Sequence, residues 1–277
     1  MNNNFISLIV VALIISIVMV SLFITGINKK KHRKDRQMLG IAWLRNLRVL
    51  LSYIQQHRGM STGYLNGGVT LKNEIDSLQK KINNEITNIS RLNSWMNKNS
   101  NWQSIIQHWF RLAENFKNNT AENNISQHNA MIKNIIYLID DMAQEHGLLL
   151  LKNDKNKPLH LLWRELLPAL EYIGQARAIG TGVSTAKICD SVSRIKLNYL
   201  CRKIETKSGN VSIDISTKQL QELKIKELIT CINEEITKDK PTIKPDIYFR
   251  LASETLDSLY MQYDKFIDDT ESFHFKN

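Results

Sequence analysis

The stretch YIQQHRGMSTG at residues 53–63 returns as YIGQARAIGTG at residues 172–182, a constant offset of 119 positions. The two copies share Tyr, Ile, Gln, Arg, Thr and Gly in register. Internal similarity at one fixed offset is typical of a duplicated structural unit. The repeat therefore predicts two halves built alike, with Arg58 in the first half and Arg177 in the second.

Apolar residues recur with helical periodicity on both sides of the two copies. The expected helices cover residues 34–65, 71–96, 100–117 and 124–151, then, after a polar linker, residues 158–184, 187–207, 216–237 and 246–268. Pro168 lies inside the fifth helix and predicts a kink there. We expect an all-α fold in which two antiparallel four-helix bundles, residues 37–151 and 158–270, are related by internal duplication.

The N-terminal stretch predicts a membrane anchor. Residues 5–27 are 23 positions without Asp, Glu, Lys, Arg or His, and at about 1.5 Å per residue a helix of this length crosses a hydrocarbon core of about 30 Å. Residues 29–36 then hold six Lys or Arg and one Asp, and such a basic flank stays on the cytoplasmic side. We expect residues 1–28 to be an uncleaved single-pass transmembrane anchor and residues 29–36 a basic juxtamembrane segment.

The formal net charge of +10 does not predict a nucleic-acid-binding protein. The juxtamembrane segment supplies half of this charge, and the remainder is spread over residues 37–277 without a basic stripe or an aromatic RNA-binding signature. The short run is better explained as a topology determinant that contacts anionic lipid.

Catalytic and metal-binding patterns are missing from the sequence. The cysteines Cys189, Cys201 and Cys231 have neither CxxC spacing nor the arrangement of a disulfide framework. We expect each of them to be a small, buried residue with a free thiol. The histidines lack ligand spacing, and no Ser-His-Asp order, phosphate loop or carboxylate pair stands out. We therefore expect no cofactor, no metal and no enzymatic activity.

The repeated motif itself suggests an anion site. Arg and Thr stand four residues apart in each copy, so they share one helix face. If the motif helices face each other, two guanidiniums converge on a small space, and a planar oxyanion satisfies both through parallel N–H donors. Nitrate, nitrite, bicarbonate or a small carboxylate all fit. The candidate ligand-binding residues are Arg58, Arg177, Thr62, Thr181, Gln56, Gln175 and His57, with Arg164 or Arg250 as a further cation.

Residue chemistry leaves a second interpretation open. Each arginine can instead form a structural ion pair with a core carboxylate, and the sequence offers Asp140, Asp141, Glu165 and Glu171. The protein is then a helical interaction or scaffold module without a small-molecule ligand.

The motif copies resemble the nitrate- and nitrite-sensing (NIT) domain family. The resemblance rests on Gln-x-Arg-Gly followed by Ser in the first half and Gly-Gln-x-Arg-Ala in the second, and it covers roughly residues 37–270. That family occurs in bacterial receptors, including kinases, chemotaxis transducers and nitrate-responsive antiterminators. It implies two four-helix bundles with nitrate or nitrite held by arginines between them, at the positions of Arg58 and Arg177. The family commonly has an acidic residue before the first arginine, where this chain has His57.

Together these patterns predict a sensor anchored in a bacterial inner membrane, with its helical domain in the cytoplasm. A periplasmic domain is the alternative, and the basic run at residues 29–36 disfavours it. Residues 37–277 show no kinase, methyl-accepting or nucleic-acid-binding pattern. We therefore expect the signal to pass to an unidentified effector protein or to act through homo-oligomerisation.

Overall fold

The structure, a computed structural model, describes residues 2–208 and 215–276. The all-α fold predicted from the sequence is confirmed, and the described residues contain no β-strand. The helices are α1 (Asn2–Leu65), α2 (Lys72–Leu92), α3 (Ser94–Lys98), α4 (Ser100–Asn115), α5 (Ala121–Glu145), α6 (Leu167–Ala186), α7 (Ser191–Ser208), α8 (Ile215–Cys231) and α9 (Pro245–Phe275).

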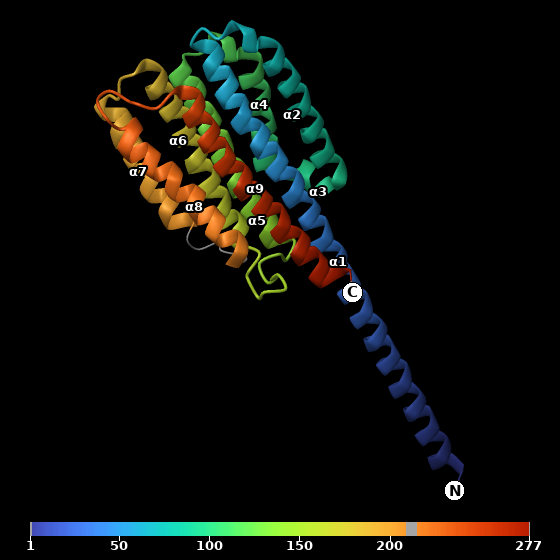
Figure 1. Cartoon of the computed structure of the whole chain (residues 1–277). Coiled ribbons are helices and arrows are strands. Elements are labelled where there is room, and N and C mark those ends of the chain that lie inside the picture. Colours follow the sequence, from blue (N-terminus) through green and yellow to red (C-terminus); the bar gives the residue numbers. More distant parts are fainter. Residues whose placement is uncertain (1, 209–214, 277) are drawn as a thin grey trace.

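Helix α1 runs without interruption from the apolar N-terminal stretch to the end of the first motif copy (Figure 1). The sequence predicts a separate helix from residue 34, whereas the structure joins the apolar stretch, the basic segment and this helix into one rod. No proline occurs in this range to break it. From Leu13 onward α1 is long and apolar enough to cross a membrane. In Figure 1 its N-terminal part projects away from the other helices.

Two groups of four long helices follow the duplicated pattern of the sequence. Helix α1 packs on α2 and α5, with α4 against α5, whereas α6 packs on α7 and α9, with α8 against α9. The short helix α3 is an extra turn between α2 and α4, and the side chain of Asn99 caps α4 by accepting from the Trp102 amide. Helix α9 runs back along α1 towards the base of the bundles (Figure 1).

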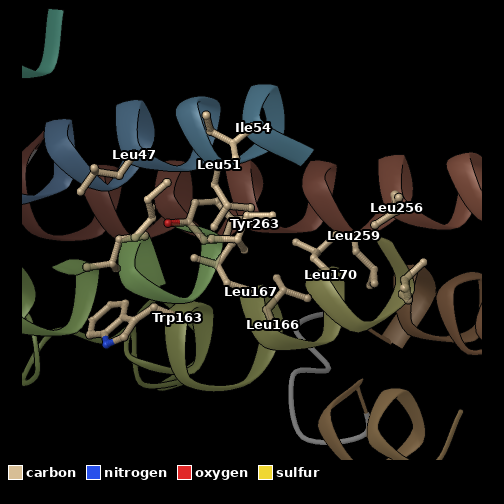
Figure 2. Packing of buried hydrophobic residues seen from close by; sticks show 14 of the residues in the cluster. Leu47, Leu51, Ile54, Trp163, Leu166, Leu167, Leu170, Leu256, Leu259 and Tyr263 are labelled. Carbon is tan, nitrogen blue, oxygen red and sulfur yellow. The ribbon is translucent and has the colours of Figure 1, made fainter. Parts of the chain in front are cut away.

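The two groups share one hydrophobic core. Figure 2 shows leucines of α1, α6 and α9 pointing towards one another around Tyr263. Tyr263 is fully buried, and its hydroxyl donates to the Leu44 carbonyl of α1 at 3.3 Å. The three cysteines are buried and unpaired, as the sequence predicts. Apolar burial therefore joins the two groups into one packed unit.

Pro168 does not kink a continuous helix that begins at residue 158. A π turn at Leu162–Leu166 comes first, and Pro168 lies in the first turn of α6, where a missing N–H is tolerated. Proline cannot donate to the carbonyl four residues earlier, which is that of Arg164. The Lys207 ammonium of α7 donates to this carbonyl instead, at 3.2 Å.

Candidate functional site

Arg58 lies inside the fold, between the two bundles. Its side chain is 2% exposed, and its Nη1 donates to Oε1 of Glu171 on α6 and to Oδ1 of Asn129 on α5, both at 2.5 Å. Glu171 is itself only 8% exposed, so the ion pair is buried on both sides. A buried arginine held by charge-assisted bonds has little freedom, which fixes its guanidinium at the junction of α1, α5 and α6.

Glu171 gathers three donors from both motif helices. Besides Arg58, Gln175 donates to its Oε1 and Gln55 to its Oε2, each at 2.8 Å. Gln55 also accepts a hydrogen bond of 2.6 Å from the Tyr260 hydroxyl of α9. The carboxylate is therefore well satisfied, and the network joins α1, α6 and α9.

Gly174 makes room for the arginine. A Cβ atom at this position would lie 2.9 Å from Nη2 of Arg58 and 3.5 Å from Nε2 of Gln55. Position 174 is the counterpart of Gln55 in the repeat, so the smaller residue of one copy accommodates the larger side chain of the other. By contrast, Gly59 and Gly182 of the motif copies face open space.

Arg177 stands one helical turn after Gly174 and is turned towards α9. Its Nη1 donates to Ser253 at 2.9 Å, and its guanidinium lies 5.0 Å from the ring centroid of Phe249. Among the described residues no carboxylate lies within ion-pair distance of Arg177. Burial lowers the pKa of Arg177, and the nearby charge of Arg58 lowers it further.

The two arginines are thus neighbours, but they are held by different partners. A cavity of about 640 Å³ opens between α5, α6 and α7. It is lined by Arg58, Asn129, Gln175 and Lys196, among others, but not by Arg177. The buried carboxylate of Glu171 pairs with Arg58 and not with Arg177, and Asp257, an exposed carboxylate of α9, only partly offsets the charge at Arg177. The site is well suited to a further anion.

The threonines and glutamines of the motif divide between the site and its surroundings. Gln175 is at the site, whereas Gln56 is exposed and donates to Ser52 of its own helix. Thr62 accepts from Asn124 inside the first bundle. The Thr181 hydroxyl is buried without a hydrogen-bond partner among the described residues. The choice of Gln56 is corrected to Gln55, because Gln55 takes the inward position on α1.

His57 belongs to the core of the first bundle, neither to the solvent nor to the anion site. It is fully buried between Trp109 and Phe116, and its Nδ1 lies 2.8 Å from Nε2 of His128. The Nδ1 of His128 lies 2.7 Å from the Asn124 carbonyl and must carry the hydrogen. His57 therefore donates from Nδ1. Burial lowers the pKa of His57 to about 4, so the ring is neutral near pH 7.

Neither further cation predicted from the sequence is placed at the site. Arg164 pairs with Asp140 at 2.7 Å, and Trp163 shares this carboxylate. Arg250 is exposed on α9. Lys196 of α7 is the additional cation that lines the cavity.

Sequence reasoning missed Asn129, Ser253 and Lys196. These residues lie outside the motif copies, on helices that the fold brings against them. Glu171 is the exception, because the sequence already offers it as a possible ion-pair partner of an arginine.

Comparisons with known proteins support the fold. No protein-family model and no curated protein sequence matches this chain. The fold is similar to a solved structure described as "Structure of the NasR transcription antiterminator", with a TM-score of 0.64 and 14% sequence identity. The similarity covers 91% of this chain and 73% of that chain. At this identity the likeness establishes a shared helical architecture.

Proposed function

We propose that this protein is a membrane-anchored sensor that binds nitrate or nitrite at Arg58 and Arg177, between its two bundles. The anion takes N–H donors from both guanidiniums, and Gln175 contributes an amide. Binding shifts the contact between the motif helices, and this change is passed to an effector protein.

The observation that carries the proposal is the state of Arg177. This guanidinium is largely desolvated, and the charge of Arg58 is close enough to lower its pKa. Within residues 2–208 and 215–276 its close partners are a neutral hydroxyl and an aromatic ring. An incompletely paired cation is expensive to bury. A planar oxyanion between Arg177 and Arg58 balances the charge with the geometry that guanidinium favours.

Two other findings support the same function. The motif copies resemble the NIT family at both arginines, and the charge of Arg58 is close enough to Arg177 to lower its pKa. The fold is also similar to that of a transcription antiterminator, and antiterminators are among the proteins in which that family occurs.

The structural interpretation of Arg58 also has an observation in its favour. Arg58 already has a buried carboxylate partner, Glu171, which is among those considered from the sequence. A protein that uses both arginines only for packing is a helical scaffold, and it does not respond to nitrate.

Calorimetric titration of the full chain in lipid nanodiscs with nitrate and with nitrite separates the two functions. We expect saturable binding, weakened about tenfold or more by Arg177→Ala, since one charge-assisted contact is worth about 1.5–3 kcal/mol. Arg164→Ala removes an arginine from the exposed pair with Asp140 and serves as the control, with affinity unchanged. Absence of binding to either anion in the wild-type protein rules out the sensor and leaves the scaffold.

We also propose that the helical domain lies in the cytoplasm, on the evidence of the basic residues that follow the apolar part of α1. The native cysteines are buried and do not report on the side of the membrane. A single cysteine at exposed Lys98, in a chain with its own three cysteines replaced by Ala, should react with an impermeant maleimide only after cell lysis. Labelling in intact cells instead places the domain outside.

A further inference from the structure

Helix α7 has two opposite apolar faces, of which the fold covers one. The inner face packs on α6 with its side chains buried, and these are Leu197, Leu200, Cys201 and Ile204. On the outer face Val192, Ile195 and Tyr199 are 60%, 68% and 46% exposed. Spacings of three and four residues place these three on one narrow stripe, as in the seam of a helix that pairs with another helix.

Basic side chains border this stripe. Helix α7 carries five Lys or Arg residues and one Glu. Two of these cations are paired, Arg194 with Asp239 and Lys207 with Glu165. Among the described residues Lys196, Arg202 and Lys203 form no ion pair, and helical spacing puts them directly beside the stripe.

We propose that the outer face of α7 is a docking surface for an amphipathic helix of a partner protein, with acidic residues beside its apolar stripe. The exposed stripe supplies apolar area for one helix, and the three unpaired cations select acidic neighbours. Acidic residues beside the apolar stripe of the partner helix can form ion pairs with these cations of α7, and such interhelical pairs set the choice of partner in paired helices.

A second copy of this chain fits the surface less well. Two α7 helices packed in parallel through this stripe bring Lys196, Arg202 and Lys203 against the same residues of the other copy. An antiparallel pair that crosses near Ile195 still brings Lys196 close to Lys196 of the other copy, so like charges repel. The surface of the membrane that α1 crosses fits less well too. Helix α7 lies alongside the bundles, with its axis nearly parallel to that of α1 and not across it (Figure 1).

The docking surface adjoins the cavity that contains Arg58. Lys196 and Tyr199 belong to both, and Leu200 lines the cavity from the inner face of α7. A partner helix on α7 therefore rests at the mouth of the cavity. Coupling between the partner and an anion rests on the proposed function, whereas docking itself does not.

A designed peptide pair tests the docking surface. Two fluorescein-labelled helical peptides share a leucine stripe at heptad spacing and differ only in flanking residues, all Glu in one and all Lys in the other. Fluorescence anisotropy with the full chain in phosphatidylcholine nanodiscs should show binding of the Glu peptide, weakening with added salt, and at least tenfold weaker binding of the Lys peptide.

Variants assign the binding to α7. Ile195→Ser, and separately Lys196→Glu with Lys203→Glu, should each weaken the Glu peptide about tenfold, because they remove the stripe or reverse its border. Lys226→Glu, an exposed position on α8, is the matched control and should leave binding unchanged.

Three outcomes overturn the proposal. They are no binding of the Glu peptide, equal binding of both peptides, and a dimer seen by light scattering that Ile195→Ser abolishes. The last assigns the surface to a second copy. Nitrate titration of the Ile195→Ser variant keeps the two proposals distinguishable, since the anion site does not include Ile195.

Discussion

The Tyr260 hydroxyl of α9 donates a hydrogen bond of 2.6 Å to Oε1 of Gln55 on α1, whose Nε2 in turn donates to Glu171 on α6. One glutamine thus links α9 to the buried ion pair of Arg58. Closer to the basic segment, Arg48 of α1 forms an ion pair with Asp264 of α9, so the two helices remain in contact there. The carboxylate at the candidate site is therefore connected to the contact between α1 and α9.

Removal of this hydroxyl should loosen the network. Tyr260→Phe leaves the buried oxygen of Gln55 without its donor, and we expect a loss of about 1–3 kcal/mol in the free energy of unfolding, measured by urea denaturation. If the proposed function is correct, the affinity for nitrate changes too, because Gln55 helps to hold Glu171.

Tyr263→Phe is the matched control for this change. Tyr263 is also buried on α9, and its hydroxyl reaches the Leu44 carbonyl only at 3.3 Å, away from Glu171. We expect a smaller loss of stability and no change in nitrate affinity. Equal effects of the two variants on affinity would show that Gln55 has no special part.

The Arg58 and Glu171 ion pair should show strong energetic coupling. Either Arg58→Ala or Glu171→Ala leaves a buried charge without its partner, and each should cost about 3–5 kcal/mol in the free energy of unfolding. The double variant leaves no unpaired charge and should cost clearly less than the two losses added together. Additive losses in chemical denaturation would contradict a shared buried pair. The exposed pair of Lys265 and Asp269 should show coupling below about 1 kcal/mol.

Periodicity and the repeat were enough to predict the helical fold. Apolar residues at spacings of three and four fixed the eight main helices, because burial of a stripe dominates helix placement. The joining of the anchor to the first motif helix was missed, since the basic segment looks like a boundary, although lysine and arginine favour helix. The π turn before Pro168 was also missed, and the Arg164 carbonyl that Pro168 leaves free takes its donor from Lys207 on α7, far along the chain.

The sequence predicted those site residues that the repeat or the need for charge balance identifies. Arg58, Arg177 and Gln175 could be found from the repeat, and Glu171 from the need to neutralise an arginine. Gln55 and Gln56 are adjacent and chemically identical, so only the helix orientation shows which faces inward. His57 is adjacent to Arg58 but points into the first bundle, and its partner His128 is 71 positions away.

Two glycines of α6 should respond oppositely to the same substitution. A Cβ atom at Gly180 would lie 2.4 Å from the buried ring of Tyr248, which is held by a hydrogen bond of 2.8 Å to the Ala176 carbonyl. We expect Gly180→Ala to lower the free energy of unfolding by about 1–3 kcal/mol. Gly182 has nothing within 4 Å, so Gly182→Ala should raise it by up to about 1 kcal/mol through helix propensity. Thermal melts that rank the two variants in the reverse order would contradict this packing of α6 on α9.

The buried histidine pair should make stability depend on pH. Burial lowers the pKa of His57 to about 4, and it holds the pKa of His128 well below the usual range, with the charges of His57, Arg58 and His108 adding to the effect. In the unfolded chain the imidazoles of His57 and His128 bind protons near pH 6.5, whereas in the folded chain they bind protons only at lower pH. The contribution of this neutral pair to the free energy of unfolding is therefore fully present above about pH 6.5, and it is lost as the pH falls towards 4.

Urea denaturation of wild type and His57→Gln between pH 4 and 8 measures this contribution. The glutamine offers an amide to His128 and Gln79 without titrating, so the variant should lose less stability than wild type as the pH falls from about 6.5 to about 4. Carboxylates titrate alike in both proteins and cancel in the comparison. Parallel pH profiles would mean that His57 does not stay neutral in the folded core, because a ring that protonates equally in both states contributes no slope.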